Sequence, residues 1–267
     1  MSGVMHRTLA ILERLAADVN GVPLATLADE LHIPRSATHR LLIELAEHGY
    51  VRQSHDRGHY MLTTKLVTLG LTHLKLSGVV DICQPILDRL ARASGELARI
   101  GVVDVDHLTW VATAQGATTG LRYDPDAGID ARLSCTSSGL AWLSTLKDDE
   151  ALELLAREGY ARPGDFGPHA PTTPTAVLKL LRSARKQGYA ITSETYRAGV
   201  ASVAVPVTVP GKGAVGVVVV SGPAVRLTEA RMLEILPEVQ RAAGEVALAS
   251  AASPLFDRAY RHDADAR

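Results

Sequence analysis

One short segment near the start of the chain carries side chains suited to contacting nucleic acid. Residues 35–40 read Arg-Ser-Ala-Thr-His-Arg. If this segment is helical, it turns small, hydroxyl and basic side chains outward. In the major groove of DNA an arginine can read guanine or hold a phosphate, and serine and histidine can reach phosphates or base edges. The DNA-contacting residues predicted on this segment are Arg35, Ser36, Ala37, His39 and Arg40.

Hydrophobic spacing predicts the helices that would position this segment. A first helix runs from Arg7 to Leu15, a second from about Leu24 to Leu31, and a third from Arg35 or Ser36 to Glu47. The break between the last two reads His-Ile-Pro, and histidine tolerates the left-handed backbone that glycine usually supplies at such a turn. We place Ala28 where the two helices touch, because a larger side chain would hold them apart. Ser36 is expected to cap the third helix.

Two strand-like segments follow this helical pair. They cover residues 50–53 and 59–63, and the intervening Ser-His-Asp-Arg-Gly has the composition of a turn. On this hairpin, Arg52 and Arg57 are placed to meet the adjacent DNA backbone or minor groove. Helices and hairpin together predict a winged helix-turn-helix in residues 1–65.

Charge alone does not argue for nucleic acid. The net charge of the chain is −1, and within residues 1–65 seven basic and seven acidic side chains cancel. Any contact with DNA must therefore come from the local arrangement of side chains. A winged-helix module that binds another protein stays open as an alternative.

Composition limits the other classes of protein. A length of 267 residues favours two domains, and 46% hydrophobic residues exclude a largely disordered chain. The two cysteines, Cys83 and Cys135, stand at no metal-ligand spacing, so neither a metal nor a cofactor is expected. No leader peptide or long apolar run is found, which predicts a cytoplasmic protein without a membrane span. A thiol enzyme that uses Cys135 is the alternative from another class, although no histidine lies near that cysteine in the sequence.

The second half of the chain mixes helical and strand-like segments in an α/β pattern of the α+β kind. Short turns between its first strands imply antiparallel pairing. The predicted helices are Gly78–Ala93, Ser138–Thr145, Asp149–Arg157, Thr173–Gln187 and Thr228–Ala249, and the predicted strands are Leu97–Val105, His107–Ala114, Thr119–Tyr123, Val200–Val209 and Ala214–Ser221. Thr173 and Thr228 are expected to cap the helices that they begin. The apolar stripe of the last helix consists of Met232, Leu233, Leu236, Val239 and Val246.

A connecting helix from about Thr64 to Leu76 joins the two halves. It holds leucines at 66, 69, 71, 74 and 76, an excess of apolar surface for a linker. We expect it to pack against its copy in a second chain; packing on its own domain is the alternative. The predicted division is 1–65 for the DNA-binding domain, 66–79 for the linker helix, 80–252 for the second domain and 253–267 for the tail.

Several stretches of the sequence resemble the IclR family of bacterial transcription regulators. From His6 to Leu69 these read HRTLAILERLA, LATLADELHIPRSATHRLLIELAEHGYV and HYMLTTKLVTLG. Later stretches read LSCTSSGLAWLS at 133–144, RKQGYAITSETYRAGVASVAVPV at 185–207 and VVVVSGP at 217–223. The resemblance covers nearly the whole chain up to about Ser253. It implies an N-terminal winged helix-turn-helix joined by a linker helix to a GAF-like mixed α/β effector-binding domain.

The resemblance also implies where a small-molecule effector binds. It places the ligand beside Ser137 and Ser138, at a helix start suited to a carboxylate. The effector-contacting residues that it implies are Tyr123, Leu133, Ser137, Ser138, Thr192, Glu194, Ser202 and Ser221. Leu140 replaces a lysine usual in the family, and Val219 stands where a related serine lines the pocket. A more apolar pocket shifts the expected effector from a small keto acid toward an aromatic or longer carboxylic acid.

These features together predict a regulator of the IclR type. Two recognition helices in a homodimer read a near-palindromic operator, and effector bound in the second domain changes their separation or orientation. The resemblance further implies pairing of dimers into a tetramer and control of a catabolic operon. The sequence predicts neither repression nor activation.

Overall fold

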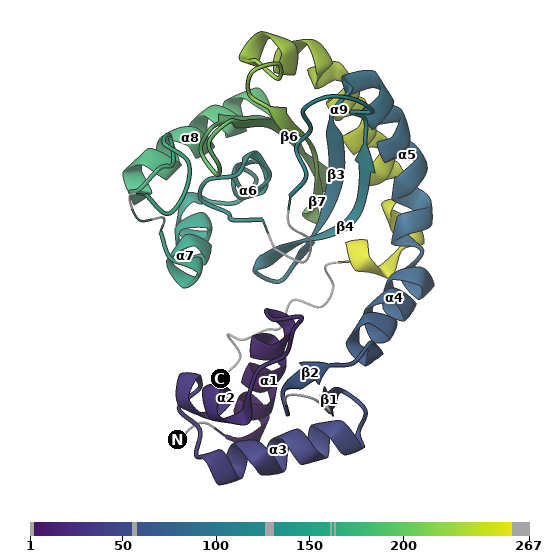
Figure 1. Cartoon of the computed structure of the whole chain (residues 1–267). Helices are drawn as coiled ribbons and strands as arrows, with labels where there is room; N and C mark the ends of the chain where they lie inside the picture. Colours follow the sequence, from purple (N-terminus) through teal and green to yellow (C-terminus); the bar gives the residue numbers. More distant parts are fainter. Residues whose placement is uncertain (1–2, 55–57, 126–130, 161, 163, 258–267) are drawn as a thin grey trace. The chain divides into compact units, whose positions relative to one another are not determined.

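The computed structural model of the chain describes residues 3–54, 58–125, 131–160, 162 and 164–257. It divides into two compact units, Met1–Leu76 and Ser77–Arg267 (Figure 1). Each unit has a hydrophobic core of its own, and each is described by itself below.

The first unit is a small helical domain with a two-stranded wing. Its elements are α1 (Val4–Ala16), α2 (Leu24–Glu30), α3 (Arg35–Glu47), β1 (Val51–Gln53), β2 (Tyr60–Leu62) and α4 (Lys65–Ser77). β1 and β2 pair antiparallel, and a bridge between Val22 and Tyr60 ties the wing to the start of α2. The core takes residues from α1, α2, α3 and both strands, so burial of their apolar faces fixes the helices and the wing together.

The turn between α2 and α3 has the predicted backbone. His32 adopts a positive φ of 53°, as the sequence led us to expect, and Ala28 is buried with 3% of its surface exposed. The carbonyl of Ala28 accepts a hydrogen bond from the amide of Ile33 at 3.0 Å, which closes the turn. This hydrogen bond ties the end of α2 to the turn before α3.

The predicted cap of α3 is wrong. The helix begins at Arg35 with Pro34 as its N-cap residue and no side-chain cap, so Ser36 lies inside the first turn. The carbonyl of Pro34 accepts hydrogen bonds from the amides of Ala37 and Thr38, both at 2.9 Å. Proline fixes the entry to the helix and leaves no capping role for the serine.

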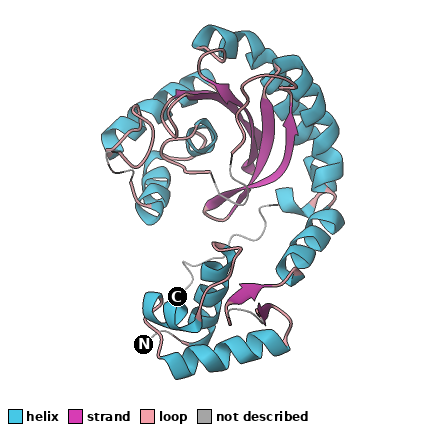
Figure 2. Ribbon diagram, viewed as in Figure 1, coloured by secondary structure: helices cyan, strands magenta, loops and turns pink. Residues whose placement is uncertain are grey.

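The second unit is a five-stranded antiparallel sheet covered on both faces. Its strands are β3 (Leu97–Asp104), β4 (His107–Gln115), β5 (Ala190–Ser193), β6 (Val200–Val209) and β7 (Gly213–Pro223), in the order β4-β3-β7-β6-β5. Figure 2 shows the sheet curving around one short helix, with long helices on its outer side. These outer helices are α5 (Val79–Ser94) and α9 (Glu229–Ala249), which also pack on each other.

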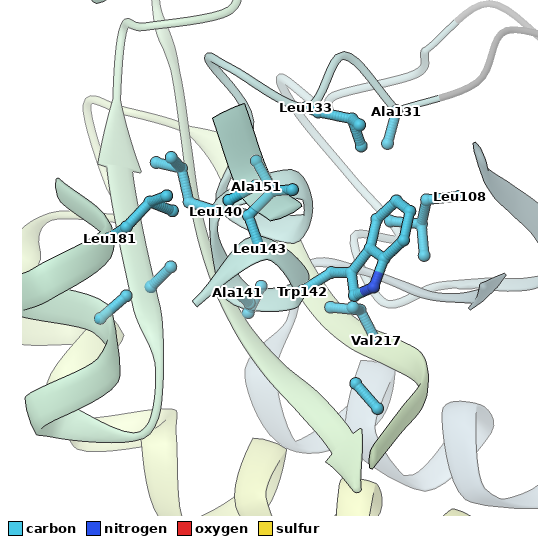
Figure 3. Packing of buried hydrophobic residues seen from close by; sticks show 14 of the residues in the cluster. Leu108, Ala131, Leu133, Leu140, Ala141, Trp142, Leu143, Ala151, Leu181 and Val217 are labelled. Carbon is cyan, nitrogen blue, oxygen red and sulfur yellow. The ribbon is translucent and has the colours of Figure 1, made fainter. Parts of the chain in front are cut away.

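The inner face of the sheet packs on α6 (Ser137–Leu143) and α8 (Pro174–Gln187), and α7 (Asp148–Glu158) adds Ala151 and Leu155 to the same core. Every residue of α6 is buried, and Figure 3 shows Trp142 and its neighbours surrounded by side chains from several elements. At Gly139 an added Cβ would lie 2.4 Å from both Cα and the carbonyl oxygen of Leu133. Only glycine allows the chain before α6 to pass so close to the helix.

Most predicted elements of this unit are found, including the caps Thr173 and Thr228, but three details differ. Residues 119–123 form no strand, because Gly120 turns the backbone at φ 73°. The strand β5, which follows Gly188, was not predicted, because it is too short to show an alternating pattern. In α9, Leu233 is 44% exposed while Ile235 is buried, so the apolar stripe is rotated from the predicted one.

The membrane-spanning potential of the helices can be stated briefly. Within the described ranges, no single helix is both long and apolar enough to cross a membrane. Only the consecutive helices α4 and α5, taken together across the break at Gly78, reach that composition.

Candidate nucleic-acid interface and ligand cavity

One face of α3 is exposed and the other is buried. Arg35, Ser36, His39 and Arg40 are exposed, as predicted. The buried side consists of Thr38, Leu41, Leu42 and Leu45. Because residues three and four apart share a helix face, burial of this set fixes which side chains point outward. Within the first unit, the outward face of α3 is therefore accessible to a partner.

Two of the predicted contact residues have partners within the unit. Arg35 lies 3.5 Å from the carboxylate of Asp29 across the turn, and both side chains are exposed. Ala37 is half-buried and packs against the core of the first unit. An exposed ion pair contributes little and yields readily to a phosphate, so Arg35 stays available, whereas Ala37 offers only part of its surface.

The wing places Arg52 on an exposed position of β1. The side-chain Nε2 of Gln53 donates a 2.9 Å hydrogen bond to the carbonyl of Gly58 across the hairpin. The ammonium of Lys65 donates to the carbonyl of His48 at 2.6 Å and lies 4.5 Å from the ring centroid of Tyr50. These contacts hold the start of α4 against the end of α3. Arg57 lies outside the described residues.

A cavity with about 610 Å³ of empty space, part of it open to solvent, lies within the second unit. It is bordered by β3, β4, β5, β6 and β7, by the start of α6, and by the loops that follow β4 and β5. Five of the eight predicted effector residues line it: Tyr123, Ser138, Thr192, Ser202 and Ser221. These residues lie far apart in sequence, and the sheet brings them together.

Three hydroxyl residues stand in one row across the sheet. Thr192 of β5 pairs with Ser202 of β6, which in turn pairs with Ser221 of β7. The Oγ of Ser202 lies 2.9 Å from the hydroxyl of Thr192 and 2.7 Å from the Oγ of Ser137. Ser137 does not line the cavity, but it joins the hydroxyls that do.

The start of α6 differs from the prediction. Thr136 caps the helix, since its side chain accepts a hydrogen bond from the amide of Gly139 at 3.0 Å. Ser137 and Ser138 are therefore the first helical residues, and neither acts as the cap. Their hydroxyls remain for other contacts, and that of Ser138 reaches the cavity.

Leu133 and Glu194 are placed away from the cavity lining. Leu133 is buried in the core around α6, where its amide donates to the carboxylate of Glu158 at 2.9 Å. Glu194 adopts a positive φ of 56°, and its carboxylate accepts a hydrogen bond from the amide of Gly199 at 2.9 Å. This glutamate closes its own loop. Val219 is likewise part of the core.

Several lining residues were missed from the sequence. They are Arg99, Trp110, Pro125, Ala131, Arg132, Thr136, Thr195, Tyr196, Arg197 and Val200. Arg99 offered the clearest signal, because it is the one charged residue inside the apolar run from Leu97 to Val103. A charge within a strand of that composition points to a polar partner or ligand.

Two arginines in the cavity wall have different surroundings. Arg132 pairs with Glu158 at 3.4 Å and donates to the backbone carbonyls of Glu158 and Gly159. The guanidinium of Arg99 instead stacks on Trp110, with its central carbon 3.9 Å from the ring centroid. Burial lowers the pKa of Arg99, while the phenols of Tyr123 and Tyr196 act in the opposite direction.

Cys135 carries no sign of activation. The residue is fully buried, and burial raises the pKa of its thiol to about 12. Its backbone carbonyl accepts a hydrogen bond from the hydroxyl of Thr195 at 2.6 Å. A thiol with so high a pKa stays protonated near neutral pH and is a poor nucleophile.

Comparison with known families identifies both units. Residues 5–55 match the IclR helix-turn-helix domain, and residues 71–248 match the family described as bacterial transcriptional regulator IclR C-terminal. The chain belongs to the IclR family. It is an IclR-type DNA-binding transcriptional regulator and not an enzyme, so the thiol-enzyme alternative is wrong.

Curated relatives of the IclR family match over most of the chain. The acetate operon repressor of Salmonella typhimurium is 31% identical over 251 residues, covering 92% of this chain and 89% of the relative. The transcriptional repressor IclR of Escherichia coli is 30% identical with the same coverage of both chains.

Solved structures confirm the predicted fold. An IclR regulator from Silicibacter matches with a TM-score of 0.78 and 21% identity, covering 92% of this chain and 95% of that one. An IclR homologue from Microbacterium hydrocarbonoxydans, solved in complex with 4-hydroxybenzoate, matches with a TM-score of 0.74 and 20% identity, covering 94% and 100%.

Proposed function

We propose that this IclR regulator reads an operator with α3 from each of two copies, and that an organic acid in the cavity modulates its binding to DNA. The outward face of α3 would contact base edges and phosphates through Ser36, His39 and Arg40, with Arg35 and Ala37 at its edge. Arg52, and Arg57 in the wing turn, would contact the adjacent backbone. This role places the protein with DNA in the cytoplasm.

The exposed apolar residues of α4 support the proposal that a second copy of the chain binds there. The apolar residues Leu66, Val67, Leu69, Leu71 and Leu76 are between 36% and 81% exposed on this helix. Such a surface is unusual for a single chain in water and suits an identical partner. A homodimer through residues 66–79 gives two recognition helices, and dimers would pair into a tetramer. The DNA-binding domain is then 1–65, the effector-binding domain 80–252 and the tail 253–267.

The charge of the cavity wall carries the proposal of an acidic effector. Of the described residues that line it, three are arginines and none is acidic. The row of hydroxyls offers donors and acceptors for the same ligand. A ligand with a carboxylate satisfies this wall, and Trp110, Tyr123 and Tyr196 favour an aromatic one. The operon under control would be catabolic, with this acid as its signal.

The DNA half is tested by selection from a pool of random duplexes with the full-length protein. We expect enrichment of a near-palindromic sequence, bound in a salt-dependent manner. Failure to enrich any sequence, together with binding that does not weaken as salt rises, would favour a protein-binding module instead.

The effector half is tested by a thermal-shift screen of the full-length protein against carboxylic acids. The panel contains small keto acids, longer aliphatic acids and aromatic acids, 4-hydroxybenzoate among them. A ligand that binds the folded state raises the melting temperature, and the same acid should change retention of the selected DNA. If no acid raises it, the proposed effector class is wrong.

A further inference from the structure

Arg99 occupies an interior position on the sheet. Its two neighbours along β3, Ala98 and Ile100, are fully buried. Arg99 pairs with Val219, which belongs to the core around α6, so its side chain starts from the inner face of the sheet. Strand alternation turns Ala98 and Ile100 to the opposite face. The half-buried Arg99 therefore lines the cavity from the inner face of the sheet.

Trp110 fixes the orientation of this guanidinium. The tryptophan stands on β4 opposite Gly101, two residues along β3 from Arg99. An arginine that stacks on an indole has one flat side covered, while its N–H groups point outward in the plane of the group. The N–H edge is the part that binds a carboxylate with two parallel hydrogen bonds.

Among the described residues Arg99 has no carboxylate partner, unlike Arg132 and Arg226, although the Nε of Arg132 is likewise buried without an acceptor. Arg132 pairs with Glu158, and Arg226 makes two hydrogen bonds to the carboxylate of Glu96, at 2.5 and 3.0 Å. For Arg99 the buried Nε has no hydrogen-bond acceptor among the described residues. A buried donor without an acceptor is costly, and a ligand carboxylate removes that cost.

We propose that Arg99 binds the carboxylate of the effector and that Trp110 makes the site selective for aromatic acids. This inference rests on the proposed function, that the cavity binds an organic acid. A carboxylate held by the N–H edge lies in the plane of the guanidinium. A ring conjugated with that carboxylate shares the plane and extends among the aromatic side chains of Tyr123 and Tyr196. An aliphatic acid makes the ion pair with Arg99 but has no flat ring to place against these aromatic side chains.

The test measures binding of benzoate, 4-hydroxybenzoate and phenylacetate to the full-length protein by calorimetry. Benzamide tests the need for the charge, and cyclohexanecarboxylate tests the need for the flat ring. We expect the wild type to bind the best aromatic acid at least about tenfold more tightly than its amide and its saturated counterpart, because a hydrogen bond between charged groups exceeds a neutral one.

Variants test whether Arg99, and not another residue of the cavity wall, binds the acid. Arg99→Met keeps most of the side-chain length and should weaken acid binding by roughly tenfold to 150-fold, the range for losing a charged hydrogen-bond partner. Arg99→Lys should recover part of the affinity, since it keeps the charge without the planar fork. Arg122→Met is the matched control, because Arg122 is exposed, pairs with Asp124 and does not line the cavity.

The outcomes distinguish this inference from the proposed function. If Arg99→Met binds the acid as the wild type does, Arg99 is not the anchor, while an acid-binding cavity stands. If the wild type binds only aliphatic acids, or binds benzamide as well as benzoate, the inference is overturned. If Arg99→Met does not fold, Arg99→Lys and the comparison of acid with amide in the wild type still decide. If no acid of any kind binds, the proposed function falls too.

Discussion

The exposed face of α3 and the cavity of the second unit use the same kind of side chain in opposite surroundings. Arg40 stands exposed on α3, within six consecutive residues that supply most of the predicted DNA contacts. Arg99 is enclosed by a sheet whose five strands come from distant parts of the chain. An exposed charge is hydrated and screened by salt, whereas an enclosed charge is screened far less. The first suits a large partner that brings many phosphates, and the second suits a single small anion.

The largest expected effect tests how rigidly the cavity is supported. In Gly139→Ala, the added methyl group would lie 2.4 Å from the backbone of Leu133, so the variant should lose about 3 kcal/mol of stability through overpacking. The measurement is urea unfolding followed by tryptophan fluorescence, because both tryptophans, Trp110 and Trp142, belong to the second unit.

Gly244→Ala is the control for this change. Nothing lies within 4 Å of a Cβ at Gly244 on α9, so alanine should stabilise that helix by about 0.5–1 kcal/mol. Equal stability of the two variants would show that the approach of Leu133 to α6 is looser than described.

The next prediction tests the exposed face of α3. Arg40→Ala should weaken binding to the selected operator by about 1–3 kcal/mol and leave the melting temperature unchanged, because the side chain supports nothing in the fold. Filter binding at several salt concentrations measures it. Lys186→Ala, exposed on α8 of the second unit, is the control. Operator binding that stays at the wild-type value would remove α3 from the interface.

A third prediction tests whether two copies of the chain form a dimer through α4. Leu71→Glu adds a charge to the exposed apolar side of α4, where Leu71 is 62% exposed. We expect the dimer to weaken at least roughly tenfold in sedimentation experiments, since two like charges would meet at a symmetric interface. Leu248→Glu is the matched control, because Leu248 is 88% exposed on α9, outside residues 66–79. An unchanged sedimentation profile for Leu71→Glu would contradict dimer formation through α4.

The smallest effect concerns the hydroxyl row. Ser202→Ala removes the hydroxyl that lies between those of Ser137 and Thr192, and should weaken acid binding by about 0.5–1.5 kcal/mol. We expect a larger loss for 4-hydroxybenzoate than for benzoate, because only the former carries a second polar group. Calorimetry with both acids measures the difference. The same loss for both would mean that the row only stabilises the sheet.

The sequence predicted local features more reliably than features that depend on strand register. The caps Thr173 and Thr228 were identified because capping is decided within one turn of helix. The cap of α3 was assigned to Ser36 because Ser36 has the right residue type, whereas the preceding proline decides where the helix starts. Helix faces in the first unit followed from spacing alone.

The cavity was harder to predict from spacing. Thr192, Ser202 and Ser221 came from family resemblance, and their row exists only through the pairing of three strands. Leu133 and Glu194 have suitable side chains near the site in sequence, but one is drawn into the core and the other is used by its own loop. Arg99 was visible as a charge in an apolar strand, yet its role depends on Trp110, which stands on the neighbouring strand.

The order of the sheet has a consequence for synthesis of the protein. One edge of β3 pairs with β4, its neighbour in sequence. The other edge pairs with β7, which comes much later in the chain, with Leu97 opposite Ser221. During synthesis, α3 and the strand that bears Arg99 therefore leave the ribosome well before β7, which forms another wall of the cavity. A chain that ends before β7 carries α3 but cannot assemble the cavity. Truncation at that point would leave α3 in place and remove the cavity of the second unit.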